Sequence, residues 1–378
     1  MIWTLLKLLF SKWLTIKRWN NFPRIEDVTP LDNTGFVIHT ALFLAHLEEK
    51  EWKIIDKEFI IKKIIFELFN SLILADINSG TRDYISKVDP KIMKKLEKKV
   101  SNFLFWFEWW DFIKDDMKDI LSDSSKKIEN KIISVSKKFA GYQEASINSR
   151  VFIYAYDIPL KQIKEFLEEE RKELFSLNNL LDSEKYKNYL WHIRRLSHSM
   201  RWSGKQRNYP ISVMSHLVIT TFIAYILWSL ENQNWKKVDI FDLMLRTIYH
   251  DIPEFITWDI ITPTKKAVEW FTDILEKVEE KMMDDYFFIY VSKEYKNEIS
   301  KYMLNPFDWE NGKLAKQADI ISALLESRIE RDSNNIDFND IYKNIKQNLN
   351  TSPYFSTNLF LKNILIDFWE EIWDFNLR

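Results

Sequence analysis

The sequence of 378 residues contains no cysteine, which excludes disulfide bonds, thiol catalysis and cysteine-liganded zinc sites. The side chains left to hold a metal ion are therefore His, Asp and Glu. An excess of either charge is also absent, because 54 Lys and Arg stand against 56 Asp and Glu. Proteins that bind nucleic acid through bulk charge usually carry a basic excess or a basic stripe, so we expect no nucleic-acid polymer as a partner.

Glycine is scarce and tryptophan abundant. The chain has 5 Gly and 16 Trp, whereas average usage gives on the order of 26 Gly, with Trp much the rarer of the two. An AT-rich genome lowers the number of Gly but does not raise the number of Trp. Some bacterial lineages read the codon UGA as glycine, and a translation that reads it as Trp writes Trp where the cell places Gly. Both explanations are open at this point.

Long apolar runs are missing as well. No run approaches the roughly 20 residues that span a bilayer, so we expect no membrane span. The segment 1–19 mixes Leu, Phe and Trp with basic residues and has no small-residue cleavage site, which argues against a signal peptide. It suits a first helix that packs on its own domain, or an amphipathic helix at a membrane interface. We favour the packed helix and expect a cytoplasmic protein.

Most of the chain has the apolar periodicity of helices. Apolar residues recur at intervals of three and four positions, for example over 60–69 and 213–227, and alternation with period two is scarce. The sequence therefore predicts an all-α protein. Polar, Ser- and Asn-containing breaks occur at 122–125, 176–179 and 332–335. The break around 178–183 falls near the middle of the chain and predicts two domains, 1–178 and 179–378.

The two predicted domains resemble each other. His39 and His216 each follow an arginine, Arg24 and Arg201, by 15 positions. Three further pairs of segments match in the same order, namely 74–77 with 249–252, 96–98 with 275–277 and 138–141 with 316–319. The offset between matched positions stays between 175 and 179 residues throughout. Duplication followed by small insertions and deletions leaves such a pattern, so we expect two similar helical bundles in tandem.

Two of the six His stand in a pattern suited to metal binding. His216 lies in an apolar helical segment, and His250 with Asp251 ends another. Adjacent helical residues point about 100° apart, so both reach one ion only where the helix end faces a cavity. With Asp319 from a third segment, the set would form an N/O site suited to Mn, Co, Fe, Mg or Zn. Taken alone, a His-Asp pair is weak evidence for a metal site, and a capped helix end is the ordinary interpretation.

The residues around this pair extend the pattern. Residues 250–263 read His-Asp-Ile-Pro-Glu-Phe-Ile-Thr-Trp-Asp-Ile-Ile-Thr-Pro. Arg201-Trp202 and Ser215-His216 precede this segment, and Lys316-Gln317-Ala318-Asp319 follows it. In this order and near this spacing, the motifs closely resemble the signature of the HD-domain phosphohydrolases, in the branch of bacterial 5′-deoxynucleotidases, over about 186–330. The resemblance implies an HD fold and metal-dependent hydrolysis of deoxynucleoside 5′-monophosphates to deoxynucleoside and phosphate.

The resemblance also implies a role for each residue of the metal site. His216, His250, Asp251 and Asp319 are the implied ligands of one divalent ion, which is Mn, Co, Mg, Fe or Zn. Such an ion lowers the pKa of bound water and so produces a nucleophile that attacks phosphorus. Glu254 and Asp251 are the implied catalytic residues, with Glu254 able to shuttle a proton. Outside the motif, Glu254 would be interpreted as a solvated acid.

Four residues are candidates for binding a nucleotide substrate. Arg201 offers a planar fork of donors to a phosphate, although a surface salt bridge is the alternative. The resemblance implies that Asp259 and Trp202 recognise the sugar, the acid accepting from a hydroxyl and the ring selecting against a 2′-hydroxyl. A turn or helix cap is the alternative for Asp259, and core packing for Trp202. Lys265 is a weaker candidate for a phosphate contact and also fits an exposed lysine.

The first half of the chain carries an incomplete version of the motif. His39 and Asp76 remain, but Ala75, Ser79 and Gly141 occupy the positions of the second His, the Glu and the last Asp. We therefore expect residues 1–178 to form a degenerate HD-like domain without catalytic function. Single-domain members of the resembling family commonly pair, which leaves two possibilities here, a homodimer or a pseudo-dimer within one chain.

Two other functions are compatible with the sequence. HD sites share their ligands across several reactions, so the substrate would alternatively be a nucleoside triphosphate, a cyclic nucleotide or an alarmone. The decayed first half suggests a second alternative, a nucleotide-sensing scaffold without catalysis.

The motif also bears on the surplus of tryptophan. In the resembling family, Gly precedes the recognition Asp, because a tight turn with positive φ suits a residue without Cβ; here Trp258 takes that position. Trp52, Trp235 and Trp309 lie in similar polar connections. We therefore predict that many of the 16 Trp, Trp258 among them, are glycine in the cell, whereas Trp202 is genuine because the family has Trp there.

Overall fold

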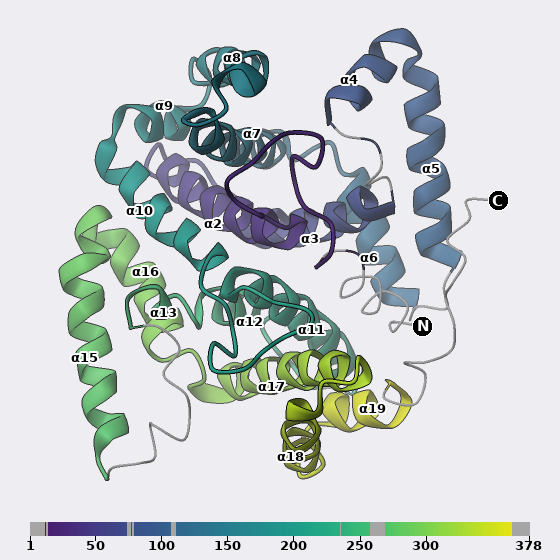
Figure 1. Ribbon diagram of the computed structural model, residues 1–378, viewed down its shortest axis with the longest axis vertical. Helices are drawn as coiled ribbons and strands as arrows, with labels where there is room; N and C mark the ends of the chain where they lie inside the picture. Colours follow the sequence, from purple (N-terminus) through teal and green to yellow (C-terminus); the bar gives the residue numbers. More distant parts are fainter. Residues whose placement is uncertain are drawn as a thin grey trace.

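The computed structural model describes residues 12, 14–73, 77, 79–106, 111–234, 236–257 and 269–364. In this part of the chain every regular element is a helix, and one isolated bridge joins Met200 to Ser212 (Figure 1). The prediction of an all-α protein is therefore confirmed.

The first half consists of long helices and their connections. They are α2 (Pro30–Glu49), α3 (Lys57–Ile73), α4 (Ser79–Val88), α5 (Pro90–Trp106), α6 (Asp111–Ser122), α7 (Lys127–Ser149), α8 (Ile153–Glu170) and α9 (Phe175–Asp182). Of the segment 1–19, the structure describes only the end; there Leu14 is buried in the core, as expected of a packed segment.

The second half places its helices around α11. They are α10 (Glu184–Arg194), η2 (Arg195–Ser197), α11 (Val213–Gln233), α12 (Ile240–Tyr249), α13 (Glu254–Thr257), α15 (Phe271–Tyr286), η3 (Phe288–Tyr290), α16 (Lys293–Leu304), α17 (Trp309–Asp332), η4 (Ile336–Phe338), α18 (Asn339–Leu349) and α19 (Phe355–Ile364). Helix α11 is long and apolar enough to cross a bilayer, contrary to the expectation from the sequence. Because 94% of its apolar window is buried, it is the kind of helix that forms a protein core.

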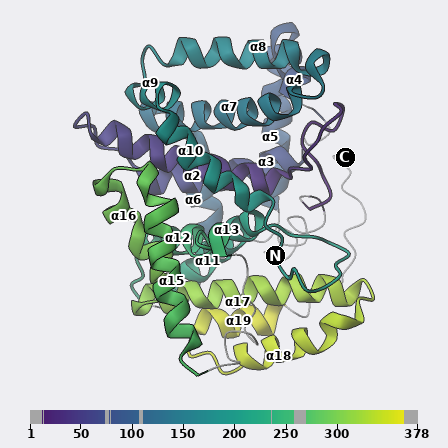
Figure 2. The ribbon, with the colours of Figure 1, turned by 60° about the vertical axis from the view of Figure 1, so that its left-hand side comes forward.

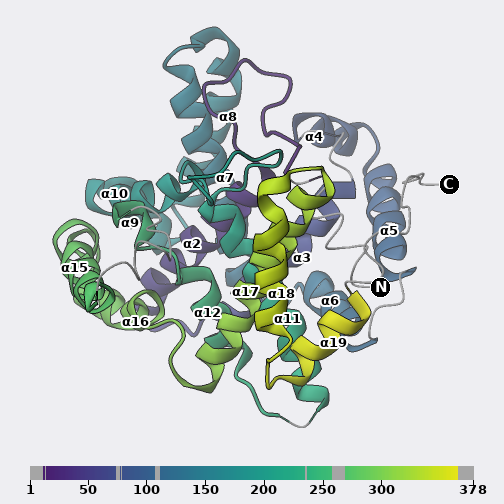
Figure 3. The same cartoon turned by 60° about the horizontal axis from the view of Figure 1, so that its bottom comes forward.

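The helices stack in layers that run through both halves. Figure 2 shows α8 above α7, then α2 with α3, then α11 with α12, and finally α17 with α18 and α19. Consecutive members of this series are in contact, and α2 packs directly on α11. Figure 3 shows α15 and α16 side by side at one flank, where α16 also packs on α12.

Asp32 joins the first turns of the two central helices. Thr29 caps α2, and its backbone N–H and hydroxyl both donate to Asp32 Oδ2, at 2.9 and 2.7 Å. The other oxygen, Oδ1, accepts from the hydroxyl of Ser212, which caps α11, and from Ser215 at 2.8 Å. Such caps satisfy backbone N–H groups that have no partner inside the helix. One buried carboxylate thus fixes the start of α2 against the start of α11.

The hydrophobic core does not divide at the middle of the chain. One cluster of buried side chains runs from Leu14 to Phe360 and includes both α2 and α11. Two of the predicted polar breaks are confirmed, because α6 ends at Ser122 and α17 ends at Asp332. The break predicted at 176–179 is wrong, because α9 continues through it to Asp182. The division into domains 1–178 and 179–378 stays a prediction.

A candidate metal centre between three helices

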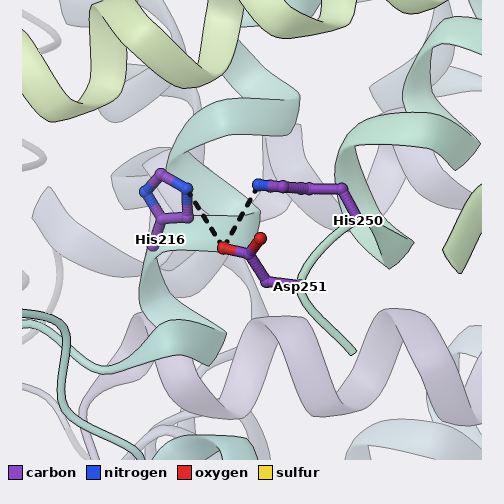
Figure 4. A group of neighbouring side chains, drawn as sticks. All are labelled: His216, His250 and Asp251. Carbon is purple, nitrogen blue, oxygen red and sulfur yellow. Dashed lines mark ion pairs between the residues drawn. The ribbon is translucent and has the colours of Figure 1, made fainter. Parts of the chain in front are cut away.

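Three helices bring the predicted ligands to one point. His216 lies in the first turn of α11, His250 and Asp251 follow the last turn of α12, and Asp319 lies on α17. The Nε2 atom of His216 is 3.1 Å from Asp319 Oδ1, and that of His250 is 3.2 Å from Asp251 Oδ2. Figure 4 shows both imidazoles directed at Asp251. The arrangement that the sequence predicts for these four residues is therefore present, and their role as ligands stays a prediction.

The hydrogen bonds of the two imidazoles direct one nitrogen of each toward the carboxylates. His250 Nδ1 is 2.9 Å from the carbonyl oxygen of Thr247, so this nitrogen donates. His216 Nδ1 is 2.9 Å from Glu326 Oε1 and donates in the same way. His250 Nε2 is buried without a well-formed hydrogen bond. Metal-ligating His residues commonly donate their second nitrogen to a carbonyl or carboxylate, so the donor set fits a divalent metal ion.

Opposite charges dominate the centre. Burial by itself would lower the pKa of His250, but Asp251 and Asp319 outweigh it and raise this pKa to about 10. Burial by itself would raise the pKa of Asp251, but His250 and Arg201 hold it below its ordinary value. The pKa of Asp319 is lowered as well, because Lys316 and the two imidazoles outweigh burial. A divalent cation would therefore displace a proton from the imidazole of His250 as it binds between the carboxylates.

Two basic side chains flank the acidic pair. Arg201 Nη1 is 3.1 Å from Asp251 Oδ2, and Lys316 Nζ is 2.8 Å from Asp319 Oδ2. The Lys316 side chain is half exposed. Lys316 was not predicted as a site residue; the signal that could have found it is its place one helical turn before Asp319, on the same face of α17.

The remaining predicted residues of the second half lie around this centre or outside the described residues. Trp202 is in the loop before α11, where its indole N–H donates to Glu326 Oε2 at 2.7 Å. Glu254 begins α13, and its charge acts on Arg201. Asp259 and Lys265 lie outside the described residues, as does Trp258.

Glu326 is a member of the site that sequence reasoning missed. It is fully buried on α17, seven residues after Asp319. Positions seven apart lie on the same face of a helix, which was the available signal. In the sequence alone, however, nothing distinguishes Glu326 from the other acidic residues of α17.

The corresponding positions of the first half show a different environment. His39 is fully buried on α2, and its ring packs against that of Tyr249 at 4.9 Å. Gly141 is buried on α7 and offers no ligand. Ala75 and Asp76 lie outside the described residues. The described part of the first half therefore presents no second copy of the centre at His39.

The chain is similar to several known proteins. The family described as 5′-deoxynucleotidase YfbR-like matches residues 188–368. A 4′-phosphooxetanocin A phosphatase from Priestia megaterium is 28% identical over 185 residues, which are 46% of this chain and 92% of the phosphatase. A 5′-deoxynucleotidase from Shewanella oneidensis is 24% identical over 175 residues, which are 45% of this chain and 88% of that enzyme.

Among solved structures, an HD-domain phosphohydrolase from Listeria innocua is similar to this chain. Its sequence identity is 26% and its TM-score 0.45, over 49% of this chain and 90% of the other. The family match begins at residue 188, so the family model leaves residues 1–187 unmatched.

Proposed function

Because residues 188–368 belong to the HD-domain family of YfbR-like 5′-deoxynucleotidases, we propose that the protein hydrolyses deoxynucleoside 5′-monophosphates to deoxynucleoside and phosphate. Family and site together make the chain a metal-dependent phosphohydrolase. The observation that carries the finer proposal is the convergence of His216, His250, Asp251 and Asp319 beside Arg201.

The chain's own residues would hold one divalent ion. His216 and His250 would bind it through Nε2, and Asp251 and Asp319 through carboxylate oxygens; Mn, Co, Mg, Fe and Zn all accept such a set. When bound, the ion acts as a Lewis acid and activates water for attack on phosphorus. Burial of both imidazoles limits the competition of bulk water for their nitrogens.

Arg201 and Lys316 are placed to bind the phosphate. Each pairs with one of the two carboxylates, and each keeps further N–H donors, since Arg has five and Lys has three. A phosphomonoester dianion between them would be neutralised from two sides. These charge-assisted hydrogen bonds would strengthen as negative charge develops on the phosphoryl oxygens.

Glu254 and Trp202 complete the proposed reaction. Glu254 lies one turn after Asp251, and its negative charge contributes to the raised pKa of Arg201. We therefore assign to Glu254 the proton transfer to the leaving 5′-oxygen. Trp202 lies next to Arg201 and would form a wall for the sugar. Residues 1–178 would take the place of a second subunit, because α2 packs directly on α11, the helix that carries His216.

The test is phosphate release from a panel of nucleotides with Mn²⁺ or Co²⁺. We expect release from deoxynucleoside 5′-monophosphates, its loss with a chelator, and a drop of more than about 100-fold in Asp319→Asn. The control is Asp242→Asn, which removes an acid on α12 that pairs with Arg246 instead of the centre.

Three results would contradict the proposal. Turnover that survives in Asp319→Asn would exclude the assigned site. A preference for triphosphates, cyclic nucleotides or an alarmone would keep the site but change the substrate. Nucleotide binding without turnover in the metal-loaded protein would favour a sensor.

A further inference from the structure

Glu326 links the metal centre to the proposed sugar-binding residue. One carboxylate oxygen accepts from His216 Nδ1 at 2.9 Å, and the other accepts from Trp202 Nε1 at 2.7 Å. The group is fully buried on α17, and it faces the side of the imidazole that is turned away from Asp251 and Asp319. It is therefore in contact with a proposed ligand without belonging to the ligand set.

The surroundings of Glu326 keep it negatively charged. Glu326 Oε2 lies 3.4 Å from Arg201 Nε and 3.6 Å from Arg207 Nη1, and it accepts from the indole N–H of Trp202. A carboxylate only accepts hydrogen bonds, so His216 Nδ1 must carry the proton of this contact. The lone pair of Nε2 is then left for the opposite side of the ring, where the other three proposed ligands lie.

We propose that Glu326 is a positioning residue that fixes the tautomer and ring plane of His216 and, through its second oxygen, the indole of Trp202. The inference rests on the proposed function in one respect, the role of His216 as a metal ligand. It adds a physical connection between the site that binds the ion and the wall that selects the sugar, because both depend on the same buried carboxylate.

Glu330 provides the matched control. It is also a fully buried acid of α17, one turn beyond Glu326. It accepts from Arg207 Nε at 3.1 Å and from the backbone N–H groups of Asn208 and Tyr209 at 2.8 and 2.9 Å. It therefore anchors the same loop that carries Trp202, but none of these bonds involves His216.

The experiment is a titration of the metal-free full-length protein with Co²⁺, followed by its visible absorption. We expect Glu326→Gln to weaken Co²⁺ binding by about 10- to 100-fold, the usual effect of losing the partner of a ligating histidine. Glu330→Gln is expected to change the Co²⁺ affinity by less than about 2-fold, although it lowers the melting temperature.

A second measurement separates orientation from general destabilisation. In the Zn²⁺-loaded protein, nitrogen NMR should show an exchange-protected Nδ1 proton on His216. We expect this proton to lose its protection in Glu326→Gln and to keep it in Glu330→Gln. If Glu326→Gln fails to fold, Glu326→Asp serves instead, because the acid is then one methylene too short to reach both partners.

The outcomes distinguish the two proposals. Wild-type Co²⁺ affinity and a protected Nδ1 proton in the Glu326 variants would overturn the positioning role while leaving the proposed function intact. Equal weakening in the Glu330 variant would show that only loop stability matters, and would also overturn it. A wild-type protein that binds no Co²⁺ would overturn both.

A second inference follows independently from the backbone. Among the described residues, six that are not Gly have φ between 56° and 66°, and five of these are Trp: Trp19, Trp52, Trp202, Trp270 and Trp309. Positive φ is uncommon for residues with a Cβ and is concentrated in Asn and Asp, whereas Gly adopts it freely. Five of the eight Trp within the described residues thus have the left-handed backbone conformation that favours glycine.

The side chains divide these five residues into two groups. Trp19 and Trp202 donate their indole N–H to the buried acids Glu144 and Glu326, at 2.6 and 2.7 Å. The rings of Trp52, Trp270 and Trp309 are instead 96%, 69% and 80% exposed. For this second group, burial does not offset the cost of the left-handed backbone.

The structure assigns Trp52, Trp270 and Trp309 as glycine in the cell, encoded by UGA, and Trp19 and Trp202 as genuine tryptophan. All three glycine positions lie at helix ends, after α2, before α15 and at the start of α17. Left-handed glycine is common where a helix ends or a turn reverses the chain.

The test is peptide sequencing by mass spectrometry of the protein isolated from its own cells. We expect Gly at positions 52, 270 and 309, and Trp at 202. Trp228, whose indole donates to the carbonyl of Val238 at 3.0 Å from within α11, is the internal control and should be Trp. Tryptophan at any of the three exposed positions, or glycine at 202, would overturn the assignment for that position.

Discussion

His39 occupies the position in the first half that the sequence pattern pairs with His216, and its ring packs against Tyr249. It is fully buried, and burial lowers its pKa to about 3. It is therefore neutral in the folded protein at every pH at which the protein is expected to work. In the unfolded chain its pKa returns to about 6.5, so acid favours the unfolded state through this residue.

His39→Leu is expected to change how stability depends on pH. Between roughly pH 6.5 and 3 the unfolded state binds a proton at His39 that the folded state does not, so stability falls by about 1.4 kcal/mol per pH unit as pH decreases. From pH 7 to pH 5, wild type should lose roughly 2 kcal/mol more than the variant, by urea denaturation. Parallel losses in the two proteins would show that His39 is not buried as a neutral group.

Lys316→Met is expected to separate phosphate binding from metal binding. Removing the ammonium group 2.8 Å from Asp319 should lower kcat/KM for a nucleotide by about 10- to 100-fold, as the loss of a charge-assisted phosphate contact does. The same change should leave the Co²⁺ affinity equal or higher, because a competing cation is gone. Lys313→Met, an exposed neighbour on α17 that pairs with Glu310, is the control. A parallel fall in metal affinity would argue against this role.

At the scale of elements, α17 organises the site. Asp319 and Glu326 project from it toward His216 of α11, and Lys316 pairs with Asp319. The first turns of α17 pass close to the segment that precedes it. A Cβ at Gly312 would collide with the backbone of Phe307, whose ring in turn packs on His250. The position of this helix therefore depends on a residue without a side chain.

Gly312→Ala is expected to destabilise the protein by about 1–3 kcal/mol, the usual cost of overpacking, because backbone rather than a flexible side chain stands in the way. Urea denaturation measures this loss. Gly204→Ala is the matched control, since a Cβ there meets nothing within 4 Å, and it should change stability by less than about 0.5 kcal/mol. Equal effects of the two substitutions would contradict the close approach at Phe307.

The helices show where sequence reasoning succeeds and where tertiary contacts override it. The periodic segments were predicted correctly because their apolar faces are buried. The polar run at 176–179 is helical in the structure. It is stabilised there because the backbone N–H of Ser176 donates to Glu48 of α2 at 2.6 Å and because Leu177 is buried. Ser176 and Glu48 are 128 residues apart in the sequence. A hydrogen-bond partner this far away in the sequence cannot be recognised from the local sequence pattern.

Prediction of the site from the sequence has the same limit. Its proposed ligands could be predicted because they stand in short motifs of fixed spacing, such as His250-Asp251. Glu326 could not, because its function depends on which side of His216 it reaches after folding. The positive φ of Trp270 likewise could not be predicted from the sequence, because it depends on the folded backbone.

At the scale of the whole molecule, the order of contacts in the two halves is parallel. Helix α2 packs on α7 and α7 on α8, as α11 packs on α17 and α17 on α18. This order supports the predicted duplication, which stays a prediction. It also places the two central helices, α2 and α11, against each other, with Asp32 between their first turns.

Asp32→Ala is expected to weaken both halves together. It removes acceptors from Thr29, Ser212 and Ser215 at the caps of two helices. With about 1 kcal/mol for each cap, the loss should be about 2 kcal/mol. Far-UV circular dichroism and Trp fluorescence should report one shared, shifted transition. Asp27→Ala, which breaks only an exposed pair with Arg24, is the control. Two separate transitions would contradict a shared core.

The bond from Asp32 to Ser215 lies directly beside His216, so an acid of the first half holds the start of the helix that carries this proposed ligand. The proposed ligands all lie in the second half, but the acid that supports the start of α11 lies in the first. For protein engineering, a gene fragment encoding only residues 188–368 would strip α2 from α11 and expose an apolar helix face. Such a fragment should aggregate on expression.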